Sequence, residues 1–226
     1  METPPKGVNC HSGKAFHERA GCSVSLALLE AACWRLDFFL PSRFVIRIFS
    51  SVLTAEQVRR LLKLEPLGVE GGLFAEVYRS TQRLPRNALL GCYSGERSLS
   101  SAIYYMLTPE TFSAIHRLKG DEIYHFYLGD PVEMLKLKPD GSAEALMLGQ
   151  NIGAGMRLQQ VVCGGTWQGS RLAPGGTFAL MGTTMAPGFD AADFELGDRE
   201  KLSDAYPAYA PLIAMLTREV AGTAKV

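Results

Sequence analysis

The stretch that decides the fold is His116-Arg-Leu-Lys-Gly-Asp-Glu122-Ile-Tyr-His-Phe-Tyr-Leu-Gly129. A histidine stands near the end of one strand-like run, a Lys-Gly-Asp turn follows, and Glu122 opens a second run. Successive side chains of a strand point to opposite faces, so a short turn brings residues at the two ends together. The stretch therefore predicts two neighbouring strands that present an imidazole and a carboxylate at the same mouth of a sheet.

More strand-like runs lie on both sides of this stretch, each bounded by turn residues such as Asp140-Gly141 and Pro174-Gly175-Gly176. The expected strands are Leu73–Ser80, Leu99–Leu107, Ser113–Arg117, Glu122–Leu128, Val132–Leu137, Ala143–Leu148, Arg157–Val162, Thr166–Leu172 and Thr177–Thr183. Many short strands at intervals of about 8–12 residues, with no helix between them, indicate a sandwich or barrel. A jelly roll fits this pattern best.

Helical patterns flank the strands. Thr54 and Gln57 have the spacing of a capping box, which predicts a short helix over about 54–63. The apolar stripe of Leu212, Ile213, Leu216 and Val220 predicts a final helix that packs on the outside of the barrel. The fold class is therefore mostly β, with a short N-terminal helix and C-terminal helices.

Composition narrows the classes of partner. The 226 residues carry 23 Lys and Arg against 23 Asp and Glu, so the net charge is zero. A neutral chain lacks the field that holds polyanions, which argues against nucleic acid or an acidic membrane as the main partner. No run reaches the roughly 18 apolar residues of a membrane helix. The nearest is 24–40, which three charged residues interrupt and whose spacing predicts an amphipathic helix.

The first fifty residues differ in character from the rest. We expect a variable extension over 1–51, partly helical or disordered, a single domain over 52–220, and a tail over 221–226. Five widely spaced cysteines without a CxxC pair favour a reducing compartment, hence a cytoplasmic location. Organellar targeting by residues 1–50 stays open. A zinc site at Cys10, His11, His17 and Cys22 lacks the paired spacing of structural zinc sites.

The central residues resemble the cupin superfamily. Its first motif runs His-x-His, then Glu, then Gly, and here His116, Glu122 and Gly129 match while Leu118 stands at the second histidine. The second motif runs Pro-x-Gly-x-x-His, and here Gln168 stands at the histidine. Two of the four usual metal ligands are therefore replaced.

The closer resemblance is to the fifth cupin family, a domain of uncharacterised function with an RmlC-like jelly roll. Its patterns are found here at residues 70–80, 112–117, 121–130, 165–168, 186–196 and 216–218. The resemblance implies a double-stranded β-helix and a homodimer. Cupin relatives include sugar epimerases, isomerases, dioxygenases and seed storage proteins, so it leaves the reaction open.

The candidate catalytic residues are His116 as base, Glu122 as orienting or relaying group, and Tyr124 as acid. If Glu122 points inward, alternation directs Tyr124 and Phe126 inward and His125 outward. A divalent metal would take His116, Glu122 and Gln168. An amide oxygen binds soft divalent metals more weakly than imidazole does, so these three side chains would bind such a metal weakly.

The candidate ligand-binding residues are cationic, aromatic or amide side chains. They are Arg79, Arg117, Gln168, Tyr78, Trp167 and Phe126. An arginine can clamp a carboxylate or phosphate with paired hydrogen bonds, although either arginine could equally form a surface ion pair. On strict alternation Arg79 faces away from Glu76 and Tyr78, so both sets cannot line one pocket.

These observations predict a barrel that binds a small polar or anionic molecule, sugar-like or nucleotide-sugar-like. Its leading enzymatic version is a metal-independent isomerase or epimerase with His116 as the base. A metal-dependent cupin enzyme is the alternative, and a non-catalytic sensor or storage-type binding protein is a third reading.

Overall fold

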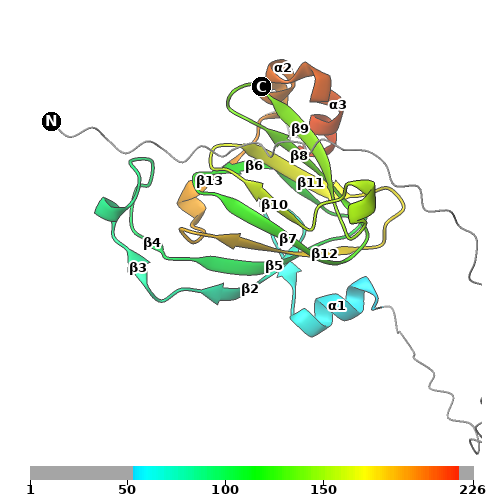
Figure 1. The fold of residues 1–226 in the computed structure, drawn as a ribbon, viewed down its shortest axis with the longest axis horizontal. Helices are drawn as coiled ribbons and strands as arrows, with labels where there is room; N and C mark the ends of the chain where they lie inside the picture. Colours follow the sequence, from blue (N-terminus) through cyan, green and yellow to red (C-terminus); the bar gives the residue numbers. More distant parts are fainter. Residues whose placement is uncertain (1–52, 219–226) are drawn as a thin grey trace, which may run out of the picture. The chain divides into compact units, whose positions relative to one another are not determined.

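Two antiparallel sheets lie face to face in the computed structural model, which describes residues 53–218 (Figure 1). The six-stranded sheet has the order β1 (Glu65–Pro66), β2 (Leu73–Arg79), β5 (Ser101–Leu107), β12 (Ala179–Met185), β7 (Glu122–Gly129) and β10 (Gln159–Val162). The five-stranded sheet has the order β13 (Phe194–Leu196), β6 (Phe112–Leu118), β11 (Trp167–Leu172), β8 (Val132–Leu137) and β9 (Ala143–Leu148). The mostly β, jelly-roll prediction is confirmed.

Smaller elements complete the described chain. They are the hairpin of β3 (Arg83–Leu84) and β4 (Arg97–Ser98), and the 3-10 turns η1 (Arg86–Ala88), η2 (Ile152–Ala154), η3 (Ala191–Asp193) and η4 (Pro207–Tyr209). The long predicted strands are all present, with ends that differ by a few residues. For example, the run expected to begin at Arg157 pairs as a strand only from Gln159.

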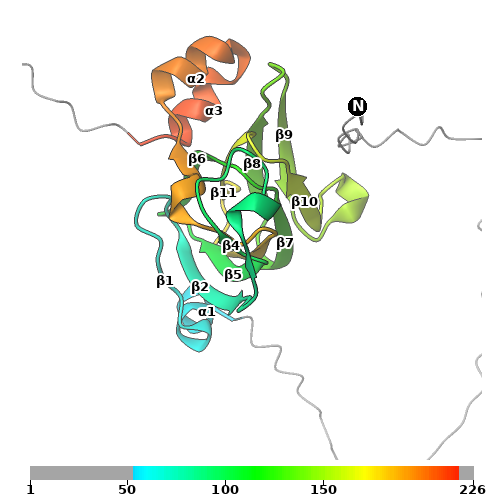
Figure 2. The ribbon, with the colours of Figure 1, turned by 90° about the vertical axis from the view of Figure 1, so that its left-hand side faces the viewer.

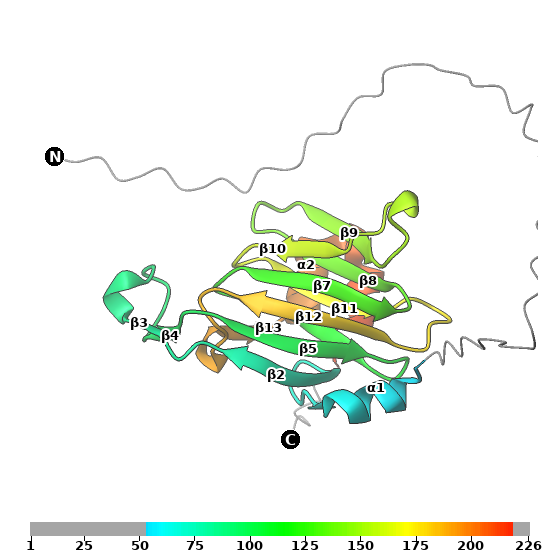
Figure 3. The same ribbon diagram turned by 60° about the horizontal axis from the view of Figure 1, so that its bottom comes forward.

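The first helix, α1 (Ala55–Leu62), begins at the predicted capping box. The Thr54 side chain accepts a hydrogen bond from the Gln57 backbone, and the Gln57 side chain accepts one from the Thr54 backbone. Val58 and Leu64 then pack against Met106, Phe178 and Leu180. The helix therefore covers one end of the six-stranded sheet, whose strands are seen side by side in Figure 3.

The C-terminal helices α2 (Arg199–Ala205) and α3 (Ala210–Met215) lie against the five-stranded sheet (Figure 2). Leu202, Ile213 and Leu216 are buried against Ile115 and Leu135. This confirms a helical stripe packed on the outside of the barrel, although Val220 of the predicted stripe lies outside the described residues.

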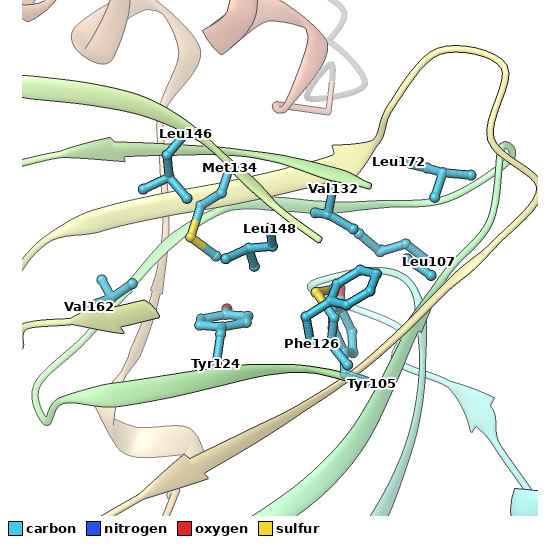
Figure 4. Close-up of a cluster of buried hydrophobic side chains, with 12 residues drawn as sticks. Tyr105, Leu107, Tyr124, Phe126, Val132, Met134, Leu146, Leu148, Val162 and Leu172 are labelled. Carbon is cyan, nitrogen blue, oxygen red and sulfur yellow. The ribbon is translucent and has the colours of Figure 1, made fainter. Parts of the chain in front are cut away.

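The space between the sheets is filled at one end only. Tyr105, Tyr124, Phe126 and Met134, with further aliphatic residues, form a buried apolar cluster there (Figure 4). At the other end, Ser101 at the start of β5, Glu122 at the start of β7 and Met185 at the end of β12 meet in register. That end holds the cavity described below.

Several predictions concern residues outside 53–218. They are the extension over 1–51, the amphipathic helix over 24–40, the zinc alternative at Cys10, His11, His17 and Cys22, and the tail over 221–226. Within the described range, none of the helices has the length and apolar character needed to cross a bilayer.

Candidate functional site

A cavity of about 500 Å³ opens at the unfilled end of the barrel. Its walls are mostly apolar and come from β2, β5, β12, the end of β6, the start of β13, the loop before β2 and the segment before β13. They include Leu67, Val69, Phe74, Ile103, Leu118, Met185, Phe189 and Phe194. The carboxylates of Glu70 and Glu122 and the hydroxyl of Thr183 supply its polar part, and Glu76 and Arg79 also border it. Pockets of this size hold small organic molecules.

Beneath the cavity, His116 and Gln168 form a cross-strand pair. They face each other between β6 and β11, and the two side chains are 1% and 2% exposed. The imidazole lies nearly parallel to the ring of Phe194, with 5.0 Å between ring centres. Phe194 borders the cavity, so His116 lies behind the wall rather than in it.

Hydrogen bonding fixes the tautomer of His116. Its Nδ1 lies 2.8 Å from the carbonyl oxygen of Ala114, which can only accept, so Nδ1 carries a proton. In the neutral ring Nε2 is then an acceptor. The amide nitrogen of Gln168 lies 3.4 Å from that Nε2 and donates to Glu122 Oε2 at 2.6 Å. The Gln168 amide thus joins the imidazole to the carboxyl group through its NH₂.

This orientation leaves the other end of the amide without a partner. Gln168 Oε1 is buried and has no hydrogen-bond partner among the described residues. Turning the amide over would set its oxygen against the Glu122 carboxylate, so the observed orientation is the better one. A buried acceptor without a donor costs about 1–3 kcal/mol.

Glu70 completes the cluster, although the sequence analysis did not single it out as a site residue. Its Oε1 accepts a hydrogen bond from Ser113 Oγ at 2.7 Å, and its Oε2 lies 4.0 Å from His116 Nε2. The only signal in the sequence was its place before the glycine pair 71–72 in the family pattern.

The glycine pair explains why Glu70 reaches the cavity. Both glycines have positive φ angles, 107° and 74°. A Cβ at Gly71 would collide with the carbonyl oxygen of Phe112, and one at Gly72 would come within 2.8 Å of the Tyr105 ring. The Tyr105 hydroxyl also donates to the Gly71 carbonyl at 3.0 Å. The chain therefore turns tightly against β5 and β6, and Glu70 is directed to the cavity.

Burial dominates the electrostatics of the cluster. Desolvation raises the pKa of Glu122, and the negative charge of Glu70 adds to the rise while His116 opposes it. Desolvation also holds the pKa values of Tyr105 and Tyr124 well above the ordinary tyrosine value. Two carboxyl groups, an imidazole and two phenols thus share one poorly hydrated region.

Tyr124 and Phe126 point into the barrel, as alternation predicted, but into its filled end. Both belong to the apolar cluster of Figure 4, and neither borders the cavity. Tyr124 interacts with the polar cluster chiefly at Glu122, and the charges of Glu122 and Glu70 raise the pKa of the tyrosine further. The interior of the barrel is therefore divided along its length into an apolar end and a cavity end. Alternation predicts that a side chain points inward but not which of the two ends it occupies.

Arg79 borders the cavity on the same side as Glu76, which corrects the sequence expectation. Between Glu76 and Tyr78 the register of β2 against β5 shifts by one residue. This bulge returns Arg79 to the face of Glu76, and Tyr78 is left 54% exposed. The Arg79 guanidinium is already engaged, since it donates to the Glu76 carboxylate and to the Phe189 carbonyl oxygen.

Arg117 and Trp167 lie away from the cavity. Arg117 forms two hydrogen bonds of 2.9 and 3.0 Å with the carboxylate of Glu195, and its guanidinium stacks 4.5 Å from the Trp167 ring centre. Trp167 itself packs toward the C-terminal helices. Of the candidate ligand-binding residues, only Arg79 borders the cavity, and Gln168 belongs to the cluster beneath it.

His125 points to the outer side of the six-stranded sheet, in the orientation expected. Its Nε2 lies 3.2 Å from the Thr184 hydroxyl, and its Nδ1 lies 2.9 Å from the Gln159 amide nitrogen. His125 therefore does not share a site with Glu122.

The residues at the cupin metal positions do not fit a metal ion. Leu118 supplies no donor atom, and Gln168 presents NH₂ rather than oxygen to both Glu122 and His116. In this orientation the NH₂ group, which cannot ligate, occupies the place between His116 and Glu122. Throughout residues 53–218, no group of three or more His, Cys, Asp or Glu side chains could hold a metal.

Comparisons with known proteins agree with this architecture. Residues 56–197 match the model of a family described as "Cupin superfamily (DUF985)". An uncharacterized yeast protein, YML079W of Saccharomyces cerevisiae, is 30% identical over 132 residues, which are 55% of this chain and 66%, just under two thirds, of the yeast protein.

Two solved structures are also similar. Protein SO0799 from Shewanella oneidensis is 33% identical with a TM-score of 0.63, and the match covers 74% of this chain and 98% of that one. A hypothetical protein from Leishmania major is 29% identical with a TM-score of 0.66, covering 74% and 100%. With most of the described residues inside the family match, this chain belongs to the DUF985 family of the cupin superfamily.

Proposed function

We propose that this protein binds a small molecule in its cavity and catalyses a metal-independent proton transfer of the isomerase or epimerase type. The observation that carries the proposal is the pair of carboxyl groups, Glu70 and Glu122, that border the cavity with His116 buried behind them. Pairs of titratable groups in unlike environments are the usual basis of acid–base catalysis.

The two carboxyl groups suit opposite roles. Desolvation raises the pKa of Glu122, so its carboxyl group holds a proton more firmly than an exposed glutamate does and is the better suited of the two to deliver one. Glu70 is suited to remove one from a carbon next to a carbonyl group. His116 Nε2, 4.0 Å away, could take that proton on, since its Nδ1 is held protonated. The sequence predicted His116 as the base that contacts the bound molecule, and in this proposal Glu70 takes that role.

The cavity supports a less polar guest than the sugar or nucleotide sugar first expected. Aliphatic and aromatic side chains make most of its wall, and Arg79, the arginine at its border, is paired with Glu76. A sugar phosphate would lose its hydration without gaining a free cation. The metal-dependent alternative has no support in the donor atoms present, and the non-catalytic binding protein is separated by the experiment below.

The test is proton exchange with solvent. The full chain is incubated in D₂O and EDTA with a panel of ketones, aldehydes, hydroxyketones, aminoketones and nucleotide sugars, and NMR follows replacement of C–H by C–D. We expect exchange with at least one compound, and a loss of about 100-fold or more in Glu70→Gln and Glu122→Gln. Glu195→Gln, on the outer surface, is the matched control and should retain the wild-type rate.

Two results would contradict the proposal. Exchange that survives in both Glu70→Gln and Glu122→Gln would place the chemistry elsewhere, and exchange that appears only after a divalent metal is added would favour a metal enzyme. A compound that binds but shows no exchange would favour the non-catalytic reading.

A further inference from the structure

We propose that the guest of this cavity has an apolar body and a cationic, hydrogen-bond-donating head of the amine type. This inference rests on the proposed binding of a small molecule in the cavity, but not on proton transfer. It replaces the anionic guest that the arginines suggested in the sequence.

The first step is a balance of hydrogen-bonding groups at the polar end. Ser113 donates to one oxygen of Glu70, and the Gln168 amide donates to one oxygen of Glu122. The Tyr105 hydroxyl also interacts with Glu70, and the Thr183 hydroxyl with Glu122, while the second oxygen of Glu70 lies 4.0 Å from His116 Nε2. Each carboxylate oxygen accepts more than one hydrogen bond, so the two groups keep acceptor capacity for a further donor.

Gln168 gives separate evidence that hydrogen-bond donors are scarce in this cluster. Its Oε1 is an acceptor, is buried with the side chain only 2% exposed, and has no hydrogen-bond partner within residues 53–218. The nitrogen of the same amide is 2.6 Å from Glu122, so the orphaned oxygen belongs to this cluster. Gln168 does not border the cavity, so its oxygen is not a contact for the guest but shows that hydrogen-bond donors are scarce in the cluster.

The second step is a balance of charge. The guanidinium of Arg79 is engaged by Glu76, that of Arg97 by Asp193 and that of Arg117 by Glu195. Within residues 53–218, neither Glu70 nor Glu122 has a lysine or arginine partner, and Arg79 is the one such residue that borders the cavity. A carboxylate or phosphate would therefore meet like charge in a poorly hydrated site, whereas an ammonium group would meet opposite charge.

The third step concerns the body of the guest. Phe74, Phe189 and Phe194 line the wall together with aliphatic side chains. Apolar surface buried there contributes about 25 cal/mol for each Å² removed from water. A space of about 500 Å³ accommodates a phenylalkyl chain. The body and the head therefore have separate binding regions within one cavity.

Three probes with one body and three heads test the inference: 4-phenylbutylamine, 4-phenylbutan-1-ol and 4-phenylbutanoate. Their Kd values are measured on the full chain by calorimetry near neutral pH. We expect the amine to bind at least 10-fold more tightly than the carboxylate, with the alcohol between them. In Glu70→Gln and Glu122→Gln this ratio should fall about 10-fold, while Glu195→Gln keeps it.

A second variant tests where the probes bind. Ile103→Trp places a large ring in the cavity wall and should weaken all three probes by 10-fold or more. Thermal unfolding confirms that each variant is folded. The inference is overturned if the carboxylate binds as tightly as the amine, if the ratio is unchanged in both glutamate variants, or if no probe binds the wild type.

The two proposals fail separately. An amine preference without any C–H exchange would leave this inference standing and remove the proposed catalysis. Exchange with a preference for carboxylates would do the reverse.

Discussion

Burial opposes the negative charge of Glu122. The residue is 7% exposed at the start of β7, and desolvation raises its pKa above the ordinary glutamate value. Between the ordinary and the raised value, the folded state binds more protons than the unfolded state. The free energy of unfolding therefore falls as pH rises through that window.

Glu122→Gln tests this electrostatic cost. The amide keeps the shape of the side chain and can still accept from Gln168, but it does not titrate. We expect the stability of the wild type relative to Glu122→Gln to fall as pH rises from the ordinary glutamate range and then to level off. Urea unfolding of both proteins at a series of pH values measures this difference in stability. If the wild type instead became more stable relative to Glu122→Gln as pH rises, the raised pKa of Glu122 would be contradicted.

At the scale of one element, α1 depends on its capping box. The Thr54 hydroxyl accepts from the Gln57 backbone at 3.2 Å, and Gln57 accepts from the Thr54 backbone at 2.8 Å. We expect Thr54→Ala to lower the free energy of unfolding by about 1 kcal/mol, because the first turn loses an acceptor. Thr54→Ser, which keeps the hydroxyl, is the matched control. Equal losses in both variants would show that the hydroxyl contributes nothing.

At the scale of the whole molecule, one buried ion pair connects distant segments. Arg97 of β4 donates to both oxygens of Asp193 in η3, each at 2.6 Å, and both side chains are almost fully buried. Burial acts to raise the pKa of Asp193, but hydrogen bonds from Arg97 and Lys119 outweigh it and lower the pKa. The pair thus secures the segment that carries Ala191 and Phe194 into the cavity wall.

Removing this pair should cost far more than removing an exposed one. Asp193→Asn leaves Arg97 buried without its counter-charge, and we expect a loss of about 3 kcal/mol in the free energy of unfolding. Glu96→Gln, which breaks the exposed pair of Arg83 and Glu96, should cost less than about 1 kcal/mol. Denaturant unfolding of both variants measures this, and equal costs would mean that burial of the pair is unimportant.

Local sequence patterns were enough to predict the strands and the first helix. Alternation and turn residues located the strands, and the Thr54 and Gln57 spacing located the start of α1, because each depends only on residues close in sequence. His116 and Glu122 were also found in this way, since a short turn joins their strands. The inward direction of Gln168 followed from the alternation of β11.

The sequence by itself therefore determined the jelly roll, its strands and part of the polar cluster. Only the tertiary structure decided that Glu70 joins that cluster, that a bulge turns Arg79 toward the cavity, and that the core occupies the end where Phe126 lies. These facts depend on contacts between residues far apart in the chain. Periodicity reports which way a side chain points, but packing and charge pairing across the fold decide what it meets there.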